Sequence, residues 1–430
     1  MNKAESTEPD PAPTRLTRQL GVNDAVVIGL GSMIGAGVFA AIGPAAQAAG
    51  SGLLIGLAIA AVVAYCNATS SARLAALYPS SGGTYVYGRE RLGHVWGFLA
   101  GWGFVVGKTA SCAAMALTFG AYAAPGSERI LAVAAVVGIT AANLAGVRKT
   151  VWLTRVIVAV VLTVLVVVVG SSFSATGSWD EVFDPGRSDP LGVLRSAGLL
   201  FFAFAGYARI ATLGEEVRDP RRTIPLAIPI ALGITLVVYA AVAVSALFAV
   251  GPDALADSVA PLTTAVRAGP FDWAVPLVRI GAAVGSAGVL LSLLVGVSRT
   301  TFAMAGEGDL PRPLAAVHPV RKVPQRAELA VAAVVVAVVC VADLRGAIGF
   351  SSFAVLGYYA VANAAALTLR PDERSGSRVV SMVGLGGCAL LAATLPTASV
   401  FGGGVLFTCG LVVWLLVRRM RADEAGGAPS

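Results

Sequence analysis

The strongest constraint on this chain is a series of apolar stretches, most of them long enough to cross a lipid bilayer as a helix. About 20 apolar helical residues span the hydrocarbon core of a membrane. Only 13% of the 430 residues are charged and 57% are hydrophobic, whereas a soluble chain carries about twice that charge. The sequence therefore predicts an all-α polytopic membrane protein with about twelve transmembrane helices, over residues 22–46, 51–76, 94–123, 129–146, 152–171, 191–213, 224–250, 274–304, 328–343, 346–369, 379–396 and 400–417.

Lysine and arginine are distributed unevenly among the connections between these stretches. With the amino terminus in the cytoplasm, nearly all of them fall inside, and only Arg129, Arg187, Arg267 and Arg345 fall in outside loops. Because positive residues are retained on the cytoplasmic side, we expect a multi-pass protein of the plasma membrane with two cytoplasmic tails, residues 1–21 and 418–430. The net charge of +7 then belongs to the inner membrane face, and no nucleic-acid partner is expected.

The first apolar stretch contains an unusual cluster of glycines, at Gly29, Gly31, Gly35 and Gly37. A glycine in a helix interior costs about 1 kcal/mol relative to alanine. The cluster indicates either a helix whose backbone opens or a helix packed closely against a neighbour, as in small-residue packing motifs.

The sixth stretch contains a second such segment, Phe204-Ala205-Gly206-Tyr207-Ala208-Arg209, which combines a glycine with a charged residue. The first and sixth stretches are five apart. Transporters built from inverted repeats place broken helices at corresponding positions of their two halves, where free backbone groups bind substrate near the membrane midplane. We therefore expect helices 1 and 6 to be discontinuous.

Four segments carry a resemblance to a known family. They are GLGSMIGAGVF in the first stretch, YPSSGGTYVYGRERLG after the second, FFAFAGYARIATLGEEVRDPRRTIPLAI across the sixth and seventh, and SRTTFAMAGEGDLPRPLAAVHP after the eighth. In this order they resemble the amino acid-polyamine-organocation family of permeases, and the resemblance covers roughly residues 20 to 420.

The resemblance implies a LeuT-type fold of two inverted repeats of five helices. Helices 1–5 would occupy residues 22–171, helices 6–10 residues 191–369, and two additional helices residues 379–417. The substrate would be an amino acid or related amine, and neither a cofactor nor a metal is expected. Its carboxylate would meet the backbone amides of one group of residues and its ammonium the carbonyls of another, namely Gly35, Ala36 and Gly37 for the carboxylate and Met33, Ile34, Phe202, Ala203 and Ala205 for the ammonium.

The sequence departs from its relatives at the positions that couple transport to an ion. Val161 stands where some proton-coupled relatives carry a lysine, and Ala287-Gly288 where sodium-coupled relatives carry a hydroxyl pair. The basic residues Lys108 and Arg209 lie within predicted spans and remain as candidates for coupling or gating.

These two residues leave the transport mechanism open. A buried lysine can exchange a proton, whereas arginine stays charged, so Lys108 is the candidate proton carrier of a proton-coupled permease. In the alternative, an uncoupled exchanger, both residues are structural, and Arg209 pairs with Glu215 or Glu216.

The rival functional classes are a membrane-embedded enzyme and a channel. A membrane-embedded enzyme requires paired in-span carboxylates, H-E-x-x-H, or a serine with a base, and no predicted span contains such a set. A channel requires a continuous polar lining. A transporter that works by alternating access agrees best with two broken helices.

Overall fold

The structure is a computed structural model in which residues 19–35, 37–78, 82–145, 151–184, 189–214, 216–318, 323–373 and 376–426 are described. The described residues are almost entirely helical. The helices of four or more residues are α1 (Val22–Met33), α2 (Gly37–Ala49), α3 (Leu53–Leu77), α4 (Thr84–Leu92), α5 (His94–Ala123), α6 (Glu128–Leu144), α7 (Val151–Phe173), α8 (Asp180–Phe183), α9 (Pro190–Phe204), α10 (Ala208–Ala211), α11 (Pro220–Asp257), α12 (Pro261–Ala268), α13 (Val275–Gly306), η5 (Arg312–Ala315), α14 (Gln325–Val341), α15 (Leu344–Leu367), α16 (Arg378–Thr394) and α17 (Thr397–Gly426).

Each predicted apolar stretch coincides with a helix or with a pair of helices. Eight helical segments of the described chain are long and apolar enough to cross a membrane, and one of these, Gly37–Leu77, joins α2 and α3. Shorter apolar helices include α1 and α16. The polytopic all-α fold class is confirmed, while the five-plus-five repeat and the domain boundaries drawn from it stay predictions.

Both predicted helix interruptions are present. Helix α1 ends at Met33 and α2 begins at Gly37. Helix α9 ends at Phe204, and a 3-10 turn over Ala205–Tyr207 leads into the four-residue α10. The glycines of the first segment thus lie beside a break, as their cost within a continuous helix suggests.

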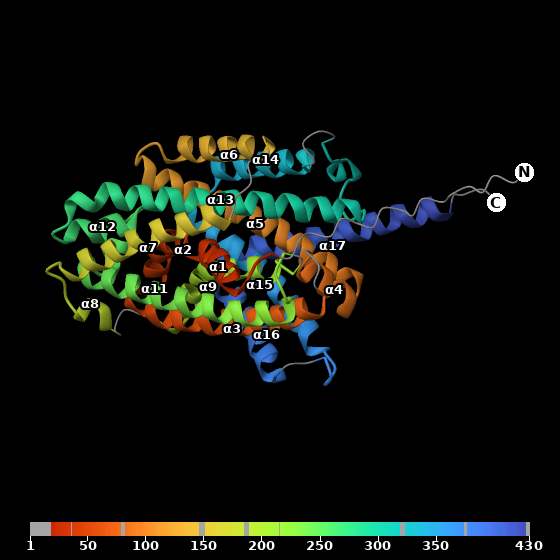
Figure 1. Ribbon diagram of the computed structural model, residues 1–430, viewed down its shortest axis with the longest axis horizontal. Coiled ribbons are helices and arrows are strands. Elements are labelled where there is room, and N and C mark those ends of the chain that lie inside the picture. The colour runs from red at the N-terminus through yellow and green to blue at the C-terminus, as the bar shows by residue number, and fades with distance from the viewer. Residues whose placement is uncertain are drawn as a thin grey trace, which may run out of the picture.

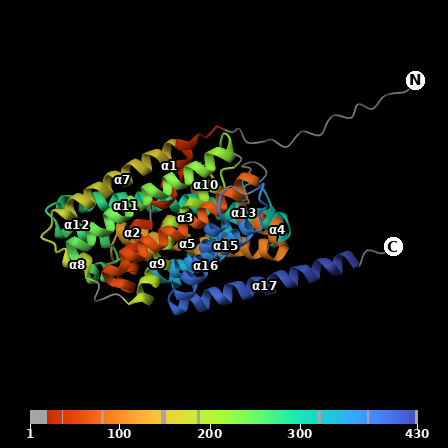
Figure 2. The same ribbon diagram turned by 90° about the horizontal axis from the view of Figure 1, so that it is seen from below.

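The long helix α13 runs along the longest axis of the molecule, and α6 lies beside α14 on one flank (Figure 1). The carboxyl-terminal part of α17 and α4 lie at one end, whereas α8 and α12 lie at the opposite end (Figure 1). Helix α17 is peripheral. Only 22% of its most apolar part is buried, and the helix extends past the body of the molecule in Figure 2.

Four of these helices, α4, α8, α12 and η5, were absent from the sequence-based prediction. Helix α4 carries Arg89, Glu90 and Arg91 within nine residues, α12 is only eight residues long, and α8 and η5 have four residues each. Because the prediction was based on long apolar stretches, it could not detect short or charged helices at the ends of the molecule.

Candidate functional site

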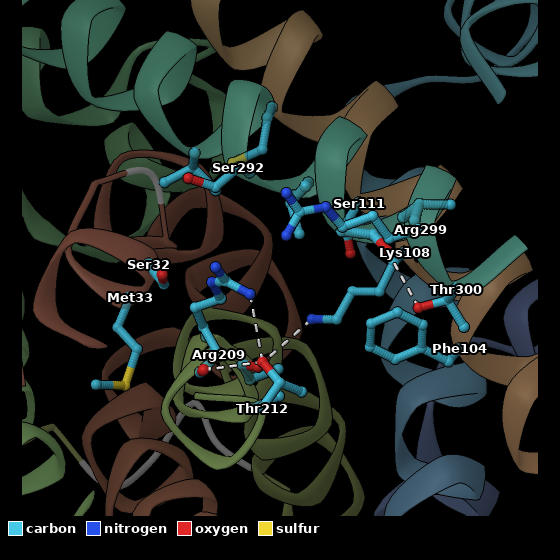
Figure 3. Close-up of a pocket in the computed structure, with 18 of the residues that line it drawn as sticks. Ser32, Met33, Phe104, Lys108, Ser111, Arg209, Thr212, Ser292, Arg299 and Thr300 are labelled. Atoms are coloured by element: carbon cyan, nitrogen blue, oxygen red, sulfur yellow. Dashed lines mark hydrogen bonds between the residues drawn. The ribbon is translucent and has the colours of Figure 1, made fainter. Parts of the chain in front are cut away.

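A cavity of about 250 Å³ lies where the two broken helices meet α5 and α13. Polar groups line it from several elements: Ser32 from α1, Lys108 and Ser111 from α5, Arg209 and Thr212 at α10, and Ser292, Arg299 and Thr300 from α13. Figure 3 shows these side chains arranged around the cavity. The cavity extends toward the end of the molecule where α4 lies, since Tyr85 of α4 also lines it.

Most of the residues predicted to bind substrate line this cavity, and so do both candidates for coupling. The lining includes Met33, Gly37, Phe202, Ala203, Ala205, Lys108 and Arg209. Ile34 and Gly35 are not in the lining, and Ala36 lies outside the described residues. The Ile34 amide still donates to the Leu30 carbonyl at 2.8 Å, so α1 keeps its helical hydrogen bonding up to the break.

The hydroxyl of Tyr239, on α11, bridges the two breaks. It lies 2.6 Å from the Met33 carbonyl and 3.0 Å from the Ala203 carbonyl, and the side chain is buried. A hydroxyl has one proton and a carbonyl oxygen has two lone pairs. Tyr239 therefore cannot satisfy both carbonyls at once, and an ammonium donor can be accepted beside it.

The carbonyl of Ala205 is approached by two further side chains. The Lys108 Nζ and the Tyr359 hydroxyl each donate to it at 3.4 Å. Lys108 is only 7% exposed, and no carboxylate of the described chain lies within ion-pairing distance of it. A buried ammonium is thus held by a long hydrogen bond beside an open cavity.

Arg209 lies nearer the open side of the cavity. Its guanidinium donates to the Thr212 hydroxyl at 3.4 Å and lies 3.9 Å from a Glu216 carboxylate oxygen. The side chains of Arg209 and Glu216 are 37% and 35% exposed, so solvent weakens this ion pair. The predicted pairing with Glu216 is confirmed, and Glu215 lies outside the described residues.

Two glycines at the breaks allow the backbones of neighbouring helices to approach closely. A Cβ atom at Gly37 would lie 2.6 Å from the Cα of Ala203, and one at Gly206 would lie 2.8 Å from the Met33 nitrogen and overlap the Ser32 carbonyl. Such distances are shorter than van der Waals contact. The close-packing interpretation of the glycines and the broken-helix interpretation therefore both hold.

A chain of polar contacts connects the cavity to the peripheral helix α17. Tyr85 donates to the buried Asp309 carboxylate at 2.8 Å, and His94 Nε2 lies 3.5 Å from the same carboxylate. The Trp414 indole then donates to His94 Nδ1 at 2.9 Å. Burial and Asp309 raise the pKa of Tyr85, so its phenol stays a proton donor.

The residues that the sequence-based prediction missed include Tyr239, Tyr359 and Arg299. The two tyrosines lie in apolar spans, and Arg299 lies near the end of the eighth predicted span. Their only signal was a polar group on an apolar helix. Their convergence depends on the packing of α11, α13 and α15 around the breaks.

Comparisons with known proteins show similarity to transporters. A family model described as amino acid permease matches residues 20–421. The chain is 60% identical to an uncharacterized transporter of Mycobacterium tuberculosis, over 97% of this chain and 96% of the relative. It is 28% identical to the methylthioribose transporter of Bacillus subtilis, over 94% of each chain. It is also 28% identical to the cationic amino acid transporter 4 of Homo sapiens, over 87% of this chain and 63% of the relative.

Proposed function

The chain belongs to the amino acid permease family, and on that premise we propose that its central cavity binds an amino acid or a related amine and carries it across the membrane by alternating access. The protein is an integral membrane transporter and not an enzyme. The observation that carries the proposal is that both broken helices end at one cavity, lined by Gly37 at the start of α2 and by Ala203 and Ala205 near the end of α9.

These helix ends suit the two charged groups of an amino acid. The start of α2 presents backbone amides and the positive end of a helix dipole, which favour a carboxylate. The carbonyls of Met33, Ala203 and Ala205 are negative partners for an ammonium. The single Tyr239 proton can be donated to only one of the Met33 and Ala203 carbonyls at a time, so the other can accept from the substrate. Backbone recognition of this kind fits the α-amino and α-carboxyl groups of any amino acid.

The packing of the half-helices is suited to alternating access. Helix α1 packs against α10 and α2 packs against α9. The segment before α1 also pairs with the segment after α10, because the Arg218 amide donates to the Leu20 carbonyl at 2.8 Å. Each break thus separates two packed pairs, which can move relative to each other. In this proposal both termini are cytoplasmic. The carboxyl-terminal part of α17 lies at the same end of the molecule as α4, so the cavity extends toward the cytoplasm.

The coupling of transport is a separate part of the proposal. Lys108 is our candidate for a proton carrier because it is buried and lines the cavity, and because it has no carboxylate partner in the described chain. Arg209 would act as a fixed counter-charge to Glu216. The alternative is an uncoupled exchanger in which both residues are structural.

Counterflow in liposomes tests the transport proposal. Purified protein is expected to exchange a labelled amino acid against an internal pool with saturable kinetics, and vesicles without protein should not. Failure across all twenty amino acids and their decarboxylated amines would contradict the proposed function. An imposed pH gradient then tests coupling: gradient-driven uptake that disappears in Lys108→Met supports a proton carrier, and wild-type uptake indifferent to the gradient indicates an exchanger.

A further inference from the structure

The cavity contains an excess of positive charge. Lys108, Arg209 and Arg299 line it together with a single described carboxylate, that of Glu216. In Figure 3 the side chains of Lys108, Arg209 and Arg299 extend toward the same space from α5, α10 and α13. The described charged groups of the cavity thus sum to two positive charges when all are ionised.

The three cations lie at different depths. Arg209 and Glu216 are about one-third exposed and Arg299 is exposed, so they lie at the solvent-accessible side. Lys108 is nine-tenths buried, and its hydrogen bond in the described chain is the long one to the Ala205 carbonyl. Charges of one sign that line a cleft raise the local concentration of the opposite ion. An anion is therefore attracted at the mouth and meets an ammonium without a carboxylate partner at the inner end.

We propose that this cavity selects amino acids whose side chain carries a carboxylate over those with neutral or basic side chains. The inference rests on the proposed function, because it concerns the substrate class of the same cavity. A zwitterionic amino acid leaves the charge of the cavity unchanged, an acidic one reduces it by one, and a basic one increases it by one. Because like charges are disfavoured in a partly desolvated site, the expected order is acidic, then neutral, then basic.

The location of the cations also fits a second carboxylate. The start of α2 and the carbonyls at the breaks are assigned to the α-carboxylate and α-ammonium groups. Lys108, on α5, lies beside the same Ala205 carbonyl, so its ammonium is adjacent to the amino-acid site. A side-chain carboxylate can then bind between Lys108 and Arg209, which are both hydrogen-bond donors toward anions.

Glutamate and glutamine are the sharpest pair of probes, because they have nearly the same shape and differ by one charge. In proteoliposome counterflow without a pH gradient, we expect unlabelled L-glutamate to compete at least about tenfold more strongly than L-glutamine, and L-lysine to compete least. Glutarate, which has both carboxylates but no amine, should compete less than glutamate. Glutarate competing as well as glutamate would overturn the assignment to an amino acid.

Variants identify which cation causes the preference for glutamate. Lys108→Met is expected to remove most of the preference for glutamate over glutamine, and Arg299→Gln, at the exposed mouth, to reduce it. Arg267→Met is the matched control, since it removes one positive charge from α12 outside the cavity lining and should keep the wild-type preference. Saturable transport that favours glutamine or lysine in the wild type would overturn this inference and leave the proposed function standing. Loss of all saturable amino acid and amine transport would overturn both.

Discussion

Replacing Gly37 with alanine adds only one methyl group, but we expect it to force two helices apart. The new Cβ atom would lie 2.6 Å from both the Cα and the Cβ of Ala203, and 2.8 Å from the Tyr239 hydroxyl oxygen. Carbon atoms in ordinary contact are about 3.5–4.0 Å apart. Helices α2 and α9 therefore have to separate by about 1 Å, because a backbone atom cannot move away by changing a rotamer.

The cost follows from the size of this overlap. Overpacking a buried contact destabilises a protein by about 1–3 kcal/mol. Alanine recovers less than about 1 kcal/mol through helix propensity, since Gly37 is the first residue of α2 and not an interior one. The net loss is about 1–2 kcal/mol. If it falls on the substrate-bound arrangement, affinity decreases about 5- to 30-fold, since each 1.4 kcal/mol is a factor of about ten.

Thermal unfolding in detergent and counterflow in liposomes measure the two consequences. Gly37→Ala should lower the melting temperature and weaken substrate competition. Gly296→Ala is the matched control for stability: Gly296 lines the same cavity on α13, but an added Cβ would meet no atom within 4 Å. This control should keep or raise the wild-type melting temperature. A Gly37→Ala protein that melts and transports like the wild type would refute the close approach of α2 and α9.

Three further perturbations test other contacts. Tyr239→Phe removes the hydroxyl beside two buried carbonyls, which should cost about 1–3 kcal/mol and lower the melting temperature; unchanged melting would contradict the bridge. Trp414→Phe removes the donor to His94 Nδ1 and should increase protease cleavage of α17, and equal cleavage rates in wild type and variant would argue against this attachment. The Arg91 guanidinium holds the pKa of the Glu373 carboxyl at about 2. The contribution of this ion pair to stability is therefore present above the ordinary carboxyl pKa and is lost as pH falls toward about 2. The difference in melting temperature between wild type and Glu373→Gln should shrink over that pH interval, and a constant difference would exclude the ion pair as its cause.

The membrane spans could be predicted from sequence because the bilayer imposes a length on every apolar helix. The predicted stretch 94–123 has the same bounds as α5, and the predicted division between stretches 328–343 and 346–369 lies close to the point where α14 ends at Val341 and α15 begins at Leu344. Helix α17 extends beyond its predicted stretch, to Gly426, because helical hydrogen bonding can continue past the bilayer where hydropathy no longer reports it.

The candidate site was predicted only in part. The difference between the residues that were predicted and those that were missed has a physical cause. Residues at a break, such as Met33 and Ala203, could be assigned because the break and the resemblance both point to local backbone groups. Tyr239, Tyr359 and Arg299 lie on other helices, and no local pattern says which polar side chain of a span turns toward the breaks. Three-dimensional packing supplies that information.

The glycines show how one residue type can serve two requirements that sequence treats as alternatives. Gly37 contacts the backbone of α9, and Gly206 contacts the backbone at the end of α1. A broken helix exposes backbone groups that a substrate can bind, but it also loses the stabilisation of continuous hydrogen bonding. Close backbone packing of α1 with α10 and of α2 with α9 restores part of that stabilisation within each pair and leaves the break between the pairs free. The same small residues that permit the opening therefore also hold its two sides as units, which is what a carrier needs if its cavity is to change access without its helices unfolding.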